Sequence, residues 1–588
     1  MEESSSRLFC RRWLRARVPP ALREEISHLL TLTGPLLLSR ILNFMLPFVV
    51  TMFCGRLGTQ VMAGYGLASA AINMSIMATG FGLAQACDTL VAQTFGCRNL
   101  PRVGVILQRG ILILLLFCLP CWGLLINTQA VLLAVGQGPE VARIVQVYVT
   151  AFLPAVPAIF LHHLHVAYLQ NQGIIMPQVY MSALANLANV ITNYVLVNWM
   201  ALGLSGSAAA NCLSHIYLCT FMFIYTWWNK LHVSTWRGWS AESLQEWGSF
   251  MRLAIPSTMM TCFEWWIYES GGFLAGLLGD NELAAQHVIM MVSFITYMVP
   301  LGIQAAACVR VGNALGAGDT AGAILSSKVA LSLAGGLAVV ECLALASARS
   351  VIGLIFTSDE KVVALVSHLM SVYCVVPLFD SLVCVSSGIL LGSGRQKIAA
   401  VANLIGYYCI GLPLAVTLMF VAELRGLGFW LGLLIAVSIQ STFYVVVILN
   451  FNWEKMTAEA VKRGKKNMQV ASLSGMAALN PETSNQRANN NSSPVNRLLS
   501  EDERMLDGGY LVQRSEVVQG PRKRLSTAQL VLRRGFITVA MVLLLVVGVI
   551  VHSLVPLPES PILPSERNMT TGWANITDTT PAPVLSTT

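Results

Sequence analysis

The chain has 588 residues, of which 55% are hydrophobic and only 11% are charged. Soluble domains carry about 25% charged residues, so this composition excludes a water-soluble fold for most of the chain. The formal net charge of +8 is explained by basic loops at a membrane surface, and we therefore expect no nucleic-acid partner.

Thirteen long apolar stretches follow one another along the chain. Each is near the ~20 residues with which a helix crosses a ~30 Å hydrocarbon layer. A β-barrel is the other structure that can span a membrane, but the alternating pattern of apolar and polar residues that it requires is absent. The sequence therefore predicts an all-α integral membrane protein with helices at 29–54, 61–83, 103–126, 142–164, 175–198, 207–228, 251–278, 284–306, 323–346, 362–391, 398–420, 427–449 and 536–555.

The segments outside these helices give the topology. We expect 1–28 to be a cytosolic N-terminal segment, because the first apolar stretch is too long for a signal peptide. Loops that this assignment places inside, among them the linker 229–250, hold more Lys and Arg than those outside. Residues 451–535 are predicted to be a disordered cytosolic linker, rich in Ser, Asn and Gln. The thirteenth helix, 536–555, then leads to an extracellular tail, 556–588.

Two glycosylation sequons lie in that tail. They are Asn568-Met-Thr and Asn575-Ile-Thr. An extracellular tail makes both asparagines candidate acceptor sites, although such sequons also occur by chance.

An internal repeat relates the segment 29–228 to the segment 251–450. LTGP at 32–35 aligns with LAIP at 253–256, and further matches follow at offsets of 220 to 222 residues. Because each copy holds six helices, the two bundles are parallel. Two related bundles are typical of alternating-access transporters. The sequence contains no GxxxxGK[ST] motif, which argues against a pump with its own ATPase. We therefore expect a secondary transporter that is neither an enzyme nor dependent on a cofactor.

Carboxylates inside the predicted helices indicate the chemistry. Glu264 lies 12 residues beyond Arg252, or about 18 Å along a helix, near the centre of the bilayer. Glu264 shares a helix face with Tyr268, and Trp265 shares one with Glu269. Acids beside aromatic rings suit a flat organic cation, although the rings could instead pack on neighbouring helices.

Other polar residues at membrane depth complete the set of candidates. Asp380 and Tyr297 are predicted to reach the same cavity as Glu264. Desolvated carboxylates exchange protons near neutral pH, so proton and cation would compete for the same groups. Weaker candidates are a mid-membrane arginine, an acid near a helix end, a histidine cluster and two groups expected at bundle interfaces: Arg40, Asp88, His162, His163, His165, His287 and Glu341.

Long motifs support a family resemblance over residues 29 to about 455. They are ACDTLVAQTFG at 86–96, EWWIYE at 264–269, VRVGNALGAGD at 309–319 and IGYYCIGLP at 405–413. These motifs resemble the animal multidrug and toxin extrusion (MATE) transporters. The resemblance implies H⁺-coupled export of organic cations such as tetraethylammonium, with the proton gradient as driving force, by a monomer in the plasma membrane.

The resemblance also implies roles for individual residues. Glu264 and Glu269 match the family's seventh-helix carboxylates, and Asp380 stands where its members usually have Glu. Trp265, Tyr268 and Tyr297 match aromatic residues of the pocket. Two further positions, Cys54 and Cys118, match thiols whose modification disturbs transport in relatives.

Three departures separate the chain from that pattern. Met291 replaces a glutamate, Arg40 replaces a glutamine and Pro377 replaces a histidine near Asp380. We expect Arg40 to pair with one of the three acids, which would alter cation affinity or coupling. Two alternatives to cation export stay open: a lipid or lipid-linked flippase, in which Arg40 would contact an anionic head group, and a regulatory protein that has lost transport.

Overall fold

The structure is a computed structural model that describes residues 19–57, 59–357, 359–465 and 527–554. Every regular element in these ranges is helical. The first half consists of α2 (Pro20–Arg56), α3 (Thr59–Ile72), η1 (Asn73–Met77), α4 (Ala78–Gly96), α5 (Leu100–Ile126), α6 (Thr128–Ala134), α7 (Pro139–Phe152), α8 (Ala155–Gln170), α9 (Met176–Asn193), η2 (Tyr194–Trp199) and α10 (Gly203–Trp228).

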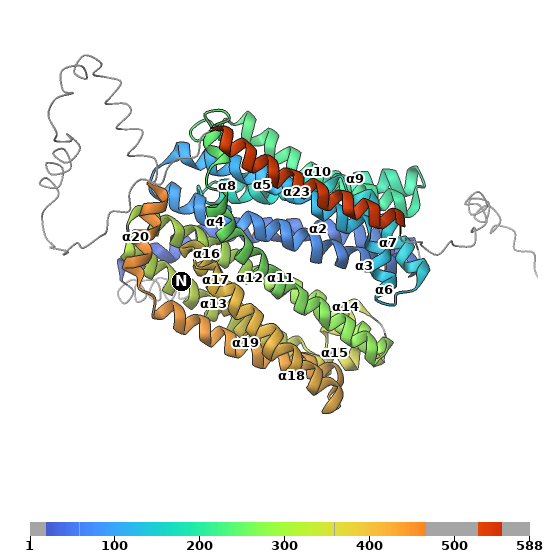
Figure 1. Cartoon of the computed structure of the whole chain (residues 1–588). Helices are drawn as coiled ribbons and strands as arrows, with labels where there is room; N and C mark the ends of the chain where they lie inside the picture. The colour runs from blue at the N-terminus through green and yellow to red at the C-terminus, as the bar shows by residue number, and fades with distance from the viewer. Residues whose placement is uncertain (1–18, 58, 358, 466–526, 555–588) are drawn as a thin grey trace, which may run out of the picture.

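The second half begins after the short turn η3 (Ala241–Leu244). It consists of α11 (Trp247–Leu278), α12 (Asp280–Ala317), α13 (Thr320–Ala348), α14 (Ile352–Phe356), α15 (Glu360–Tyr373), α16 (Val376–Ser393), α17 (Gln396–Asn403), η4 (Leu404–Gly411), α18 (Leu412–Val416), η5 (Thr417–Val421) and α19 (Arg425–Leu449). Two more helices follow, α20 (Trp453–Gly464) and α23 (Thr527–Leu554). The halves form two layers in Figure 1, each with a hydrophobic core of its own.

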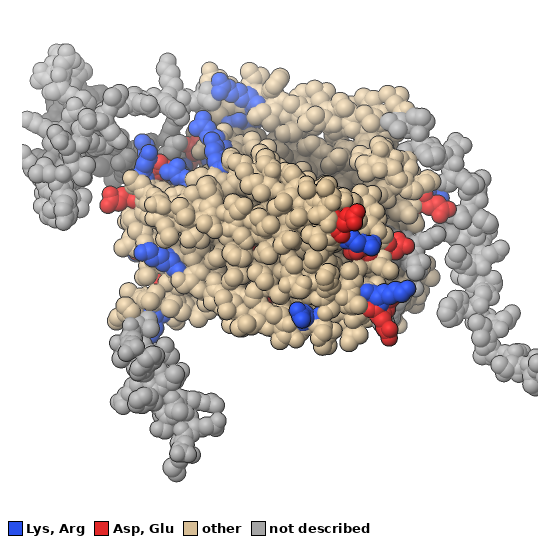
Figure 2. All heavy atoms as spheres, turned by 90° about the horizontal axis from the view of Figure 1, so that it is seen from below, with Lys and Arg blue, Asp and Glu red and all other residues tan. Residues whose placement is uncertain are grey.

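The surface is that of a membrane protein. Charged side chains gather toward the two ends of the molecule, with a broad band between them that is almost free of charge (Figure 2). Ten of the described helices are long and apolar enough to cross a membrane, or eleven if the bent pair α7–α8 counts as one. Each of the thirteen predicted stretches coincides with a helix or a broken helix. Two of them, α9 with η2 and α11, are not among the helices that are apolar enough to count as membrane spans. The all-α membrane fold is confirmed, whereas the count of thirteen crossings stays a prediction.

Two predicted spans are broken in the same place of the repeat. The stretch 142–164 is two helices, α7 and α8, bent by 59° where Pro154 supplies no backbone N–H. The stretch 362–391 is likewise α15 and α16, with Pro377 in the first turn of α16. Hydropathy did not reveal these breaks because a run of apolar residues continues across each of them.

Part of the linker that we expected to be disordered is a helix. In α20 the apolar side of an amphipathic helix is buried through Trp453, Met456 and Ala460. Its first turn is capped by the Asn452 side chain, which accepts a hydrogen bond from the Lys455 N–H at 3.0 Å. The prediction for 451–535 was therefore wrong at its start, and also at its end, because α23 begins at Thr527.

α23 packs along α5, on the outside of the first half (Figure 1). Gly548 lies against Gly123, and the Asn127 amide donates to the Gly548 carbonyl at 2.8 Å. At the other end Arg534 donates to the Leu244 carbonyl at 2.9 Å. The tail that follows, with Asn568 and Asn575, lies outside the described residues.

The halves meet closely at the end of the molecule that carries α20, which we call the α20 end. Thr89 and Gln93 of α4 donate to the carbonyls of Leu391 and Gly392, at 2.6 and 2.9 Å. Arg463 of α20 donates to the Gln93 side chain at 3.0 Å. Among the described residues, the hydrogen bond between the halves that lies farthest from the α20 end joins the Trp266 side-chain N–H to the Met74 carbonyl, about halfway along the helices. All other such bonds lie nearer to the α20 end. The α20 end is therefore closed.

Glycines make this closure possible. A Cβ on Gly316 would lie 2.1 Å from the Gln93 carbonyl oxygen, and one on Gly96 would lie 2.2 Å from that of Asn313. These two glycines occupy equivalent positions of the repeat. Each lets α4 and α12 approach with their backbones in contact.

We predict that Gly316→Ala lowers the melting temperature of the purified full-length protein, because a methyl group in close-packed surroundings costs roughly 1–3 kcal/mol. Gly34→Ala is the control, since a Cβ there meets nothing within 4 Å. Equal melting temperatures for the two variants would contradict the tight contact between the halves.

Candidate functional site

One buried acid of the second half lies in the middle of α11. Glu264 is 8% exposed, and the Tyr297 hydroxyl of α12 donates a hydrogen bond to its Oε1. The structure therefore brings together two residues that the sequence predicted to share a cavity.

A second acid faces the same space from α16. Asp380 is 6% exposed and lies near Tyr268, one turn beyond Glu264 on α11. The Tyr268 hydroxyl and the Asp380 carboxylate interact with each other, although neither that hydroxyl nor Asp380 Oδ1 makes a hydrogen bond of full geometry among the described residues. The pair can therefore still accommodate a ligand, a proton or water.

No positive side chain in the described part of the chain forms an ion pair with these acids. None of the ion pairs in the described part involves Glu264 or Asp380. An uncompensated charge at this depth costs several kcal/mol, about 2.5–3.5 on insertion scales. The pair is therefore suited to bind something positive, either a proton or a cation.

Aromatic rings separate this cluster from the first half. Trp265 stacks on Phe81 of α4, with ring centroids 6.2 Å apart and planes inclined by 20°. Tyr268 faces the acids, whereas Trp265 forms the wall between the halves. Glu269, half-buried and about 7.5 Å further along α11 than Glu264, makes no described contact with Asp380 or Tyr297.

Two tyrosines that the sequence did not single out belong to the cluster. Tyr407 of η4 is fully buried near Tyr268 and Glu264, and its hydroxyl has no described partner. Tyr373 of α15 shares a 3.0 Å hydrogen bond with Thr296. The position of Tyr407 in the motif IGYYCIGLP was a signal for it, but the break between α15 and α16 hid Tyr373.

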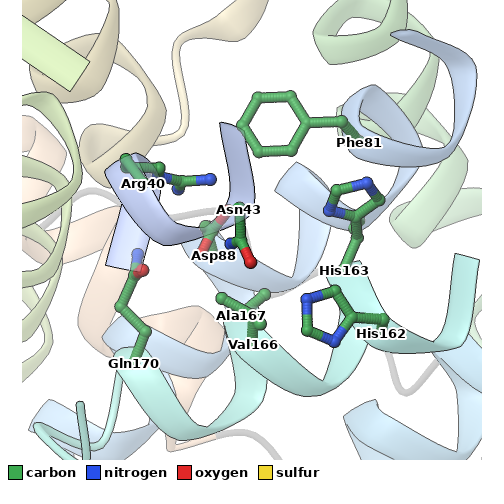
Figure 3. Close-up of a pocket in the computed structure, with 10 residues that line it drawn as sticks. Arg40, Asn43, Phe81, Asp88, His162, His163, Val166, Ala167 and Gln170 are labelled. Carbon is green, nitrogen blue, oxygen red and sulfur yellow. The ribbon is translucent and has the colours of Figure 1, made fainter. Parts of the chain in front are cut away.

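A separate pocket lies in the first half (Figure 3). It has a volume of about 30 Å³ and is lined by Arg40, Asn43, Phe81, Ala84, Asp88, His162, His163, Val166, Ala167 and Gln170. A volume of this order holds about two water molecules. The pocket is thus too small, in this conformation, for an organic cation.

Arg40 points into this pocket and not toward the acids of the second half. Its guanidinium lies over the Phe81 ring, 5.6 Å from the centroid, with Asp88 as the acid nearby. It makes no ion pair within 4.0 Å with a described acid. The expectation that Arg40 pairs with Glu264, Glu269 or Asp380 was wrong, because Phe81 and Trp265 stand between.

Asp88 is held by the polypeptide around it. Its Oδ1 accepts a hydrogen bond from the Asn171 amide at 2.6 Å. Arg40 and Asp88 thus form a loose, oppositely charged couple in the first half.

The other candidates of the first half lie in its own core or contact its own helices, whereas His287 is exposed on α12 of the second half. Cys54 lies 3.1 Å from the Ser207 hydroxyl, and Cys118 bonds its own helix; both are in the first-half core. His165 bonds Thr226 at 2.9 Å, and the rings of His162 and His163 lie 5.9 Å apart. Among the described residues no group of His, Cys, Asp or Glu is arranged to hold a metal ion.

The fold and this pair of polar sites define a membrane transporter built from two related bundles. The MatE family model matches the chain twice, at residues 35–195 and 256–417. The two matches start 221 residues apart, which agrees with the offset of the internal repeat. This chain belongs to the multidrug and toxin extrusion (MATE) family.

Curated relatives agree over nearly the full length. Multidrug and toxin extrusion protein 1 of Danio rerio is 44% identical over 560 residues, covering 94% of this chain and 95% of the relative. The Homo sapiens protein of that name is 43% identical over 536 residues, covering 90% and 94%. Multidrug and toxin extrusion protein 2 of Mus musculus is 47% identical over 455 residues, covering 77% and 79%. These relatives are transporters, not enzymes.

Solved structures share the architecture. The crystal structure of the eukaryotic MATE transporter AtDTX14 superposes with a TM-score of 0.73 at 28% identity, covering 76% of this chain and all of that one. An outward-facing multidrug resistance MATE transporter gives a TM-score of 0.65 at 16% identity, covering 75% and 97%. The latter likeness concerns the fold alone.

We predict that Arg40→Gln lowers the melting temperature, because it leaves Asp88 buried without its counter-charge at a cost of about 1–3 kcal/mol or more. The double variant Arg40→Gln, Asp88→Asn keeps the net charge and should recover part of that loss. Strictly additive losses in this double-mutant cycle would show that the two charges do not interact.

Proposed function

We propose that this chain is an H⁺-coupled antiporter that exports organic cations, including drugs, toxins and endogenous amines and guanidines, by alternating access. The observation that carries the proposal is the buried pair Glu264 and Asp380, which lies beside aromatic rings without a described ion-pair partner. The printed names of the relatives, which refer to extrusion of drugs and toxins, support export as the activity.

Coupling follows from competition for the carboxylates. Each acid needs one positive charge when it loses its proton inside the membrane, and a proton or a substrate cation supplies it equally well. Binding of a cation therefore releases a proton, and binding of a proton releases the cation. The proton gradient is the driving force, and no cofactor takes part.

The aromatic side chains give the site its preference for flat, delocalised cations. Trp265 and Tyr268 present ring faces next to the acids, where cation–π attraction contributes ~0.5–2 kcal/mol. Tyr297 orients Glu264 through its hydrogen bond. We assign Glu269 to the path between this cluster and the end opposite α20.

Alternating access requires the halves to part where they now touch. The α20 end is closed by the bonds of Thr89, Gln93 and Arg463, so any path from the acids to water in this conformation leads toward the opposite end. Opening the other way must break these bonds. Because Gly96 and Gly316 carry no side chain, α4 and α12 can return to this close contact when the α20 end closes again.

Charge distribution supports a cytosolic α20 end. Basic residues concentrate there, namely Arg98, Arg102, Arg237, Arg310, Arg395, Lys397, Lys455, Lys462, Arg463 and Lys465. By the positive-inside rule the N-terminus is then cytosolic, and thirteen crossings place the C-terminus outside. We propose the plasma membrane as the location and a monomer as the working unit.

A lipid flippase is less well supported. Such an activity calls for a cationic cavity to hold an anionic head group, but the first-half pocket balances Arg40 with Asp88. Loss of transport is the remaining alternative, and a transport assay excludes it directly.

We predict that proteoliposomes of the full-length chain take up labelled tetraethylammonium when their interior is acidic, and that Glu264→Gln lowers the initial rate at least ~10-fold, the effect of losing an interaction of about 1.4 kcal/mol. Glu360→Gln, the same change on the first turn of α15, is the control. If wild type is no faster with a pH gradient than without one, proton coupling is refuted; if Glu264→Gln matches wild type, Glu264 has no part in it.

The proposed topology predicts glycosylation of the C-terminal tail. A glycosidase should increase the electrophoretic mobility of the wild-type protein from animal cells but not that of the variant with Asn568→Gln and Asn575→Gln. An antibody against the tail should stain intact cells; staining only after permeabilisation would place the tail inside.

A further inference from the structure

One acid of the second half has no role in the mechanism described so far. Glu341 lies in α13, three residues after buried Ala338 and four before buried Leu345, so it shares their face of the helix. The neighbours Val340 and Leu343 are 62% and 67% exposed and face the lipid. The helical register therefore directs Glu341 into the bundle.

Hydroxyl groups connect Glu341 to the acid of α16. Its carboxylate lies beside Thr296 of α12. Thr296 Oγ1 shares the 3.0 Å hydrogen bond with the Tyr373 hydroxyl, and Tyr373 lies near both Asp380 and Glu341. The hydroxyls of Thr296 and Tyr373 thus lie between the carboxylates of α13 and α16, and Thr296 Oγ1 also bonds the Ser293 carbonyl at 3.1 Å.

The position of this bridge is fixed by packing. Tyr373 meets the Trp430 ring edge-on at a centroid distance of 4.9 Å, and the Trp430 N–H donates to Gln286 at 2.8 Å. Because Trp430 and Tyr373 are fully buried, the Tyr373 hydroxyl has little freedom to turn elsewhere.

Among the residues that the structure describes, no base forms an ion pair with Glu341. The titratable groups around it are the acid Asp380, the Tyr373 hydroxyl and the thiols Cys342 and Cys374. Arg349 of the same helix lies eight residues on, or about 12 Å away. α2 and α20 pack on α13 near Ser326 and Thr320, about 22 Å or more along the helix.

We propose that Glu341 is a third carboxylate of the cation-exchange site, coupled to Asp380 through Thr296 and Tyr373. This inference rests on the proposed function, because it extends the same site. Glu264, Asp380 and Glu341 reach the site from α11, α16 and α13, and the described part contains no cation paired with any of them. The site therefore holds one more positive charge, as a proton or as part of the substrate, than Glu264 and Asp380 alone.

The test compares Glu341→Gln, Glu341→Asp and the exposed control Glu360→Gln in the purified full-length protein. We expect Glu341→Gln to weaken the apparent affinity for tetraethylammonium roughly tenfold, to change the pH dependence of exchange, and to flatten that of the melting temperature. Glu341→Asp, which keeps the charge, should restore most of the wild-type behaviour. A group that only fills space would give no such difference between Gln and Asp.

Two comparisons keep the outcomes distinct. If Glu341→Gln matches wild type in affinity and in both pH profiles while Glu264→Gln is inactive, the inference about Glu341 is wrong and the proposed function stands. If the wild-type protein is no faster with a pH gradient than without one, the proposed function fails, and the pH dependence of the melting temperature of Glu341→Gln then decides on Glu341 alone. Should Glu341→Gln fail to fold, Thr296→Val tests the bridge; unchanged pH profiles there would overturn the coupling.

Discussion

The free energy of an ionised carboxylate inside an apolar bundle is the constraint on which the rest of this structure depends. Glu264 and Asp380 are buried in the second half, and the described residues supply no base within ion-pair distance. A protein that only needed stability would replace such groups, since each charge costs several kcal/mol there. Tyr268, Tyr297 and Tyr407 surround the acids with hydroxyls that can donate to a carboxylate but cannot neutralise it. The arrangement is stable only when a positive species visits, and that requirement is what a transport site needs.

Movement of the halves depends on a second constraint, the contact of bare backbone at the α20 end. Gly96 and Gly316 bring the backbones of α4 and α12 into contact, and beside them side chains of α4 reach carbonyls of α16. Such contacts are specific but small, because each gives about one hydrogen bond worth ~0.5–1.5 kcal/mol. A seam made of many weak bonds can therefore form and break at a modest energetic cost. Arg463 of α20, the helix that follows the second half, also donates a hydrogen bond to Gln93 of α4 at this contact between the halves.

The sequence was sufficient for the fold class and the repeat, because long apolar stretches and a constant offset survive any uncertainty in helix ends. It also placed Glu264, Tyr268, Tyr297 and Asp380 in one cavity, since their depth follows from spacing alone. It failed where the outcome depends on which helices become neighbours. Arg40 was expected beside those acids, but Phe81 and Trp265 intervene. Glu341 was assigned to an interface, because nothing in α13 indicates that Thr296 and Tyr373 stand opposite. The amphipathic pattern of α20 was present in the sequence and was obscured by its polar surroundings.

The two halves of the repeat differ in how their buried acids are compensated by positive charge. In the first half Arg40 and Asp88 form an opposite-charge couple around a small pocket, with Asn171 fixing the acid. In the second half Glu264 and Asp380 have no such couple among the described residues, and we propose that their charge is left for a mobile partner. Phe81 and Trp265 form the boundary, so a cation bound to the acids meets an aromatic face on that side and not the guanidinium. If the halves rotate against each other, this stacked pair must slide or separate, because each ring belongs to a different half. In the proposed mechanism the aromatic boundary would link the occupancy of the acidic site to the relative position of the halves, through packing rather than through charge.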